Sequence, residues 1–127
     1  MEVIVNNDGA TMLKLIIVEF VAIFLTGCSS PGDIRSTSPN LDLVSQKSSK
    51  TVAICIADKW ENGGLFATVP VNMRPTTSGY TMSWLNGMGG VGLLVDVDDL
   101  GTGSKTQYFQ GGVIGAGRFE VAVLNCQ

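Results

Sequence analysis

The chain has 127 residues, a formal net charge of −3, 15% charged residues and no histidine. This length allows one domain, and the slightly acidic charge provides no basic field for nucleic acid. The lack of histidine excludes Ser-His-Asp and Cys-His catalysis and imidazole metal sites. Sixteen glycines, against two tyrosines and five phenylalanines, predict many turns and a modest core.

An apolar run lies near the N-terminus. It covers residues 15–25, is interrupted only by Glu19, and follows the basic residue Lys14. Its length is that of a signal-peptide core, whereas a helix that spans a bilayer takes about 20 residues. We therefore predict a signal peptide over residues 1–27. Met12 is a candidate natural start, because the residues before it include carboxylates that are unusual ahead of such a core.

The apolar run ends in Leu25-Thr26-Gly27-Cys28, followed by Ser29. This stretch resembles the bacterial lipobox, in which an aliphatic residue and two small residues precede a cysteine. The resemblance implies cleavage between Gly27 and Cys28, a diacylglycerol on the Cys28 thiol and an acyl chain on the new amino group. In enteric-type bacteria, a serine after the cysteine further implies the outer membrane. The alternative is a short buried helix ending at Gly27, with Cys28 as an ordinary core thiol.

The expected acyl chains bear on cofactors and partners. Each buried methylene contributes roughly 0.8 kcal/mol to membrane binding, so two or three chains hold a protein almost permanently. No cofactor beyond these covalent chains on Cys28 is expected, and no metal. Residues 28–127 carry seven basic and eight acidic side chains, so we expect the lipid anchor to bind the membrane and we expect no nucleic-acid partner.

Serine, proline and other polar residues dominate residues 29–49. Such a composition buries too little apolar surface to offset chain entropy. We therefore predict that residues 28–49 form a lipidated N-terminus and a flexible tether, with a reach of about 70 Å when fully extended. Leu41, Leu43 and Val44 interrupt the polar composition. They could dock on the domain or on a partner, but we favour incidental linker residues.

Residues 50–127 are predicted to fold as a small domain with an amphipathic helix at each end. Apolar residues recur there at i, i+3 and i+4, which is typical of a helix with one buried face. Ser48 or Ser49 can cap the first helix, and Gly63 can end it. Each predicted apolar face includes a cysteine. The two faces consist of Val52, Cys55, Ile56 and Trp60, and of Phe119, Ala122, Val123 and Cys126.

Between the two helices the apolar residues alternate with a period of two. The stretches GYTMSWL (79–85), GLLVDVD (92–98) and SKTQYFQ (104–110) therefore predict three strands joined by glycine-containing turns. Residues 65–78 contain two prolines and predict a loop with one edge strand. The predicted fold is α+β: a helix, a three-stranded antiparallel meander and a helix, with both helices on one face of the sheet.

Lipidation of Cys28 would leave two thiols, Cys55 and Cys126. An even number of remaining cysteines in an exported protein favours a disulfide, because the bacterial periplasm is oxidising. The bridge would close a loop of about 70 residues and stabilise the domain by roughly 4 kcal/mol. Two buried, unpaired cysteines are the alternative. No Cys-x-x-Cys motif occurs, so no catalytic or metal-binding cysteine is expected.

Two groups of side chains offer ligand chemistry. Asp96 and Asp98 lie on one face of the predicted strand 92–98 and, with Asp99, could attract calcium, but we favour a solvated strand edge that opposes aggregation. Trp60, Tyr80 and Trp84 could form an aromatic platform, but their periodic positions favour core packing. Neither group predicts a catalytic residue.

The stretches CIADKWE, GYTMSW and GRFEVAVLNCQ resemble those of small lipoproteins from proteobacteria and their prophages. They contain no catalytic signature. We expect a non-enzymatic lipoprotein on the periplasmic face of the outer membrane, with a structural or protein-interaction role and another envelope protein as partner. One alternative is a prophage lipoprotein that excludes superinfecting phage. Another is a small periplasmic ligand-binding protein or enzyme that uses Asp96 and Asp98.

Overall fold

The computed structural model describes residues 29–63, 70–113 and 115–127. The predicted signal peptide (1–27), the lipobox and the lipid attachment residue Cys28 lie outside these residues. The alternative of a short buried helix ending at Gly27 lies outside them as well.

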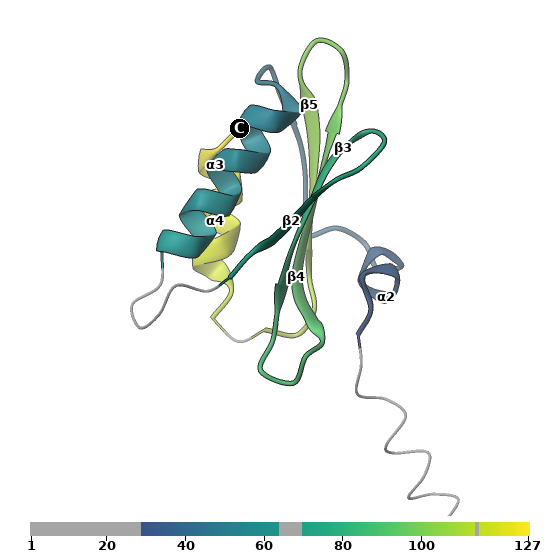
Figure 1. The fold of residues 1–127 in the computed structure, drawn as a ribbon, viewed down its shortest axis with the longest axis vertical. Coiled ribbons are helices and arrows are strands. Elements are labelled where there is room, and N and C mark those ends of the chain that lie inside the picture. The colour runs from purple at the N-terminus through teal and green to yellow at the C-terminus, as the bar shows by residue number, and fades with distance from the viewer. Residues whose placement is uncertain (1–28, 64–69, 114) are drawn as a thin grey trace, which may run out of the picture.

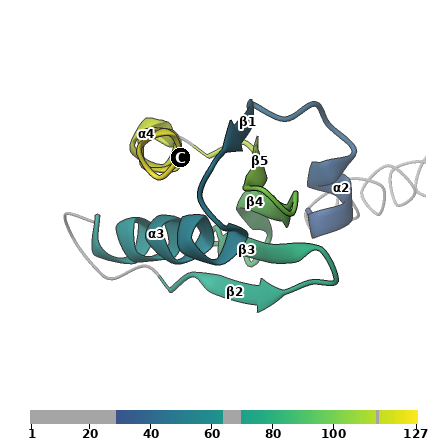
Figure 2. The ribbon, with the colours of Figure 1, turned by 90° about the horizontal axis from the view of Figure 1, so that it is seen from above.

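A five-stranded antiparallel sheet with the order β1-β5-β4-β3-β2 forms the centre of the molecule. α3 and α4 pack on one face of the sheet and α2 lies on the other, as the view along the sheet shows (Figure 2). The predicted α+β class is confirmed, and the sheet is wider than the predicted meander. The elements, in chain order, are α2 (Pro31–Arg35), β1 (Leu41–Ser45), α3 (Ser49–Asn62), β2 (Asn72–Pro75), β3 (Gly79–Leu85), β4 (Val91–Asp99), β5 (Ser104–Gln110) and α4 (Gly117–Asn125) (Figure 1).

The predicted meander is present as β3, β4 and β5, and its bounds agree with the sequence pattern to within one residue. The edge strand expected within residues 65–78 is β2, which pairs with β3. Residues 64–69 lie outside the described part of the chain. The period of two is reliable here because the side chains of these strands alternate between two different environments.

The prediction of a flexible tether is wrong. The chain after Ser29 forms α2, and its first turn is closed by a capping box: the Ser30 hydroxyl accepts from the backbone N–H of Asp33, whose carboxylate accepts from the Ser30 N–H at 2.8 Å. Pro31 occupies a position where a helix needs no N–H donor. Ile34 of the same turn is buried.

The strand β1 also contradicts the prediction of a flexible tether. It pairs with β5 from Leu41 opposite Tyr108 to Ser45 opposite Ser104. Leu41 and Leu43 pack against the main core, whereas Val44 points outward and is 72% exposed. Average polarity concealed this strand, because only two of its apolar residues, Leu41 and Leu43, face the core, and both are partly buried.

The two long helices form as predicted. α3 begins after Ser48, whose hydroxyl accepts from the Thr51 N–H at 3.2 Å. Trp60 of α3 is buried against Phe119 of α4, with ring centroids 5.6 Å apart, and its indole N–H donates to the Phe119 carbonyl oxygen at 3.1 Å. The predicted apolar faces therefore meet each other as well as the sheet.

Cys55 of α3 and Cys126, which follows α4, form a disulfide with their Cα atoms 5.8 Å apart. This is the pairing that the cysteine count favours. Because the two cysteines are 71 positions apart in the chain, the bond joins α3 to the C-terminal end of the described fold.

Reduction of the Cys55–Cys126 bond is expected to lower the free energy of unfolding by about 4 kcal/mol, because the unfolded chain regains the entropy of a long loop. Urea unfolding with and without dithiothreitol measures this difference. The double variant Cys55→Ala/Cys126→Ala is the control and should show no response to the reductant. An unchanged urea midpoint for the reduced wild type would contradict the prediction.

Candidate functional site

The outer face of the sheet, which α3 and α4 do not cover, holds the acidic strand of the sequence analysis. α2 covers one part of this face with a small apolar cluster. The remainder carries polar side chains, which the antiparallel register places opposite one another: Thr81 faces Asp96, and Asp96 faces Gln107. The cluster beneath α2 consists of Ile34, Val91, Leu94 and Phe109.

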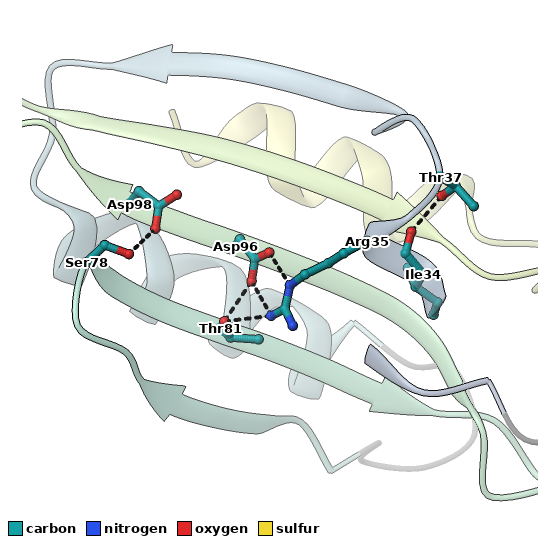
Figure 3. Close-up of polar contacts among 7 residues, drawn as sticks. All are labelled: Ile34, Arg35, Thr37, Ser78, Thr81, Asp96 and Asp98. Carbon is teal, nitrogen blue, oxygen red and sulfur yellow. Dashed lines mark hydrogen bonds and ion pairs between the residues drawn. The ribbon is translucent and has the colours of Figure 1, made fainter. Parts of the chain in front are cut away.

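Arg35, at the end of α2, reaches across the outer face to Asp96 (Figure 3). Its Nε donates to Asp96 Oδ2 at 2.7 Å, and its Nη2 donates to Asp96 Oδ1 at 2.7 Å. The Thr81 hydroxyl donates to the same Oδ1 at 2.6 Å and accepts from Arg35 Nη2 at 3.1 Å. A bidentate arginine–carboxylate pair thus joins the N-terminal segment to the middle of the sheet.

The electrostatics of this group favour the charged pair. Partial burial raises the pKa of Asp96, but the hydrogen bonds from Arg35 and Thr81 and the positive charge of Arg35 outweigh it, so the pKa of Asp96 is lowered. Its side chain is only 17% exposed. Asp96 is therefore an ionised carboxylate whose oxygens are both occupied.

The interpretation of the acidic residues as a solvated strand edge is wrong. β4 is the central strand of the sheet. Asp96 binds Arg35, and the Asp98 carboxylate accepts from the Ser78 hydroxyl at 2.6 Å (Figure 3). Within the described residues, no three histidine, cysteine or acidic side chains are grouped so that they could hold a metal ion.

The three aromatic residues considered as a ligand platform lie in different surroundings. Trp60 is buried in the core, and Tyr80 packs partly buried against it. Trp84 stacks on Phe119 with centroids 5.9 Å apart and an interplanar angle of 30°. Core packing, the favoured interpretation, agrees with these positions.

Another aromatic residue, Tyr108, is buried beneath the helices, and its hydroxyl has no hydrogen-bond partner among the described residues. Burial, with a smaller effect of the Glu120 charge, raises the pKa of Tyr108 to about 12. Tyr108 therefore stays protonated at neutral pH, and it packs edge-on against Trp60.

The residues next to the predicted lipid attachment site are part of the domain. Ser29 follows Cys28 directly, and its carbonyl oxygen accepts from the backbone N–H of Val91 at 3.0 Å. Val91 is the first residue of β4, so Ser29 lies beside the turn of the β3–β4 hairpin. A Cβ atom on Gly90, in the hairpin turn, would lie 3.4 Å from the Ser29 nitrogen.

Sequence reasoning missed Arg35 as the partner of Asp96. Two signals were present in the chain: Ser30, Pro31 and Asp33 have the spacing of a helix start, and LDLVS (41–45) has strand alternation. Both are short and lie in a polar segment. They predict local structure, but only the folded sheet brings Arg35 to a carboxylate 61 positions away.

Among the described residues, no helix has both the length and the apolar character needed to cross a bilayer. No protein-family model, curated protein or solved structure matches the chain.

Replacement of Asp96 by asparagine is expected to lower the free energy of unfolding by about 1–3 kcal/mol at neutral pH, because the amide has only one acceptor oxygen and no negative charge to pair with Arg35. The folded-state pKa of Asp96 is lowered, so its contribution is present above the unfolded pKa of about 3.9 and is lost as the pH falls through the folded value. The difference between wild type and D96N should therefore shrink below about pH 4. Urea unfolding at several pH values measures it.

Asp42 supplies the matched control. It pairs with Lys105 at 3.5 Å, and both side chains are well exposed. Asp42→Asn should cost no more than about 0–1 kcal/mol. Equal losses for D42N and D96N would contradict a special role of the Arg35–Asp96 pair.

Proposed function

We propose that the chain is the precursor of a bacterial lipoprotein, anchored by acyl chains on Cys28 in the outer membrane and facing the periplasm. Its folded domain acts through contacts with another envelope protein and not through catalysis.

The observation that carries this proposal is the position of the lipobox-like stretch Leu25–Cys28. It follows an apolar run of signal-peptide length, and it directly precedes Ser29, the residue at which the described domain begins. Cleavage before Cys28 would therefore remove the apolar run and leave the domain intact. Ser29 after the cysteine supports the outer membrane over the inner one, by resemblance to enteric lipoproteins.

The Cys55–Cys126 disulfide supports an exported protein. Structural disulfides persist in oxidising compartments such as the periplasm and are rare in the reducing cytosol. Once Cys28 carries lipid, the three cysteines of the chain are all accounted for, since the other two bind each other.

The hydrogen bonds that occupy the acidic side chains of β4 support a role without catalysis. Asp96 is occupied by Arg35 and Thr81, and Asp98 by Ser78. A general acid or base needs a carboxyl group that can reach a substrate and exchange a proton near the working pH. An ionised carboxylate with a lowered pKa and two bound oxygens is poorly suited to this task.

Replacement of Cys28 by alanine is expected to remove the anchor. The wild-type protein should enter the detergent phase on partitioning, and its N-terminal peptide should begin at Cys28 with the added mass of a diacylglycerol and an acyl chain. Cys28→Ala should keep residues 1–27 and carry no lipid mass. Cys55→Ala/Cys126→Ala is the matched control and should be lipidated like the wild type. A wild-type protein that keeps its first 27 residues would contradict the proposal.

Replacement of Asp98 by asparagine is expected to leave the function unchanged. The Asp98 side chain hydrogen-bonds only to Ser78 among the described residues, and an amide can accept the same hydrogen bond. Proteins crosslinked to the lipoprotein in intact membranes should be the same for wild type and Asp98→Asn, and should be lost for Cys28→Ala. Loss of function in a folded, lipidated D98N variant would instead favour an enzyme or ligand-binding protein.

A further inference from the structure

The distance between the predicted anchor and the domain is very short. A flexible tether over residues 29–49 would have allowed a reach of about 70 Å, but those residues form α2, β1 and the start of α3. Ser29 itself is bonded to Val91. An acyl chain on Cys28 would therefore begin within one residue, about 4 Å of backbone, of the β3–β4 hairpin.

The same hairpin exposes large apolar side chains. Met88, in the turn, is 89% exposed, and Leu85, at the end of β3, is 53% exposed. Met88 lines a shallow depression together with Trp84 and Val113. We call Trp84, Leu85, Met88 and Val113 the hairpin patch.

Close packing connects the two segments that form the hairpin patch. The side chains of Trp84 and Val113 both pack against Gly92. A Cβ atom added at Gly92 would lie 2.9 Å from the Trp84 ring and 2.7 Å from Val113 Cγ2. The N–H of Gly111 donates to the Gly92 carbonyl oxygen at 2.8 Å. Trp84 of the hairpin and Val113 of the segment after β5 therefore line one depression together with Met88.

The chain around the hairpin patch carries no charge. Residues 75–95 and 106–117 contain no aspartate, glutamate, lysine or arginine. Approach to a bilayer therefore desolvates no ionised side chain of these segments, and that desolvation is the main cost of placing protein at the hydrocarbon boundary. Tryptophan, here Trp84, is also enriched at membrane interfaces.

We infer that the hairpin patch lies in the headgroup region of the bilayer that holds the acyl chains of Cys28, so that the domain rests on the membrane in one orientation. The inference depends on the proposed lipidation of Cys28. The anchor supplies the affinity, because the patch is too small to bind a membrane alone. The patch supplies the orientation, in which the β3–β4 turn points to the membrane and the β4–β5 turn points away from it (Figure 1).

Leu100 provides a matched control position. It is an apolar residue with 51% exposure, and it follows the last residue of β4, whereas Met88 precedes the first. The nine residues of β4 separate the two ends of the strand by about 30 Å. In the inferred orientation a probe at residue 100 stays in water.

The experiment places a fluorescent probe at each position. Met88→Cys and Leu100→Cys variants of the full chain are purified from membranes in lipidated form, labelled with nitrobenzoxadiazole at the new thiol, and reconstituted into vesicles of phosphatidylethanolamine and phosphatidylglycerol. We expect blue-shifted emission at position 88, with quenching by nitroxide-labelled acyl chains and protection from iodide. We expect water-like emission and quenching by iodide at position 100.

Each outcome decides the inference. Lipidated protein that floats with the vesicles but shows the same quenching at both positions overturns the membrane contact and leaves the lipoprotein proposal intact. A second outcome is protection of position 88 from iodide in native membranes but not in vesicles that hold no other protein. This result would assign the patch to a protein partner and would also overturn the membrane contact. Protein without lipid on Cys28 overturns the proposed function, and the inference with it.

Discussion

The Arg35 guanidinium lies across Thr81 and Asp96 in the middle of the sheet, and the placement of α2 depends on it. Three hydrogen bonds from Arg35 hold the end of α2 to β3 and β4. With α2 in place, Ile34 is buried over Leu94 and Phe109, and Ser29 lies beside Val91. Together with the apolar cluster around Ile34, these hydrogen bonds offset the cost of ordering a polar segment.

A second long-range link acts on the opposite face of the sheet. The disulfide joins α3 to the end of α4 across 71 positions, and the Arg35–Asp96 pair joins α2 to β4 across 61. A domain of about a hundred residues buries a limited apolar core, so both links matter to its stability. One is covalent and does not respond to pH, whereas the other requires an ionised carboxylate.

The ordered segment after Ser29 changes what an anchor on Cys28 would do. A flexible tether would let the domain reach partners far from the membrane in any orientation. A domain that begins at such an anchor would be confined to the bilayer surface, and in the inferred orientation it would present the sides of the molecule rather than its base to other proteins. The uncharged, apolar hairpin patch at the base is consistent with this arrangement.

The sequence by itself determined the two long helices, the meander and the favoured cysteine pairing. Periodicity placed α3, α4 and β3–β5 because the side chains of these elements alternate between core and solvent with a regular period. The cysteine count favoured the Cys55–Cys126 bond because the third cysteine has its own predicted use. The lipobox-like stretch is local, so no tertiary information is needed to recognise it.

The tertiary structure alone decided the role of residues 29–49 and of the acidic strand. α2 and β1 are short, and neither would be stable in isolation. They form because β5 offers an open edge to Leu41–Ser45 and because Asp96 offers a carboxylate to Arg35. These partners are distant in the chain, and no local pattern encodes which residues a folded sheet will bring together.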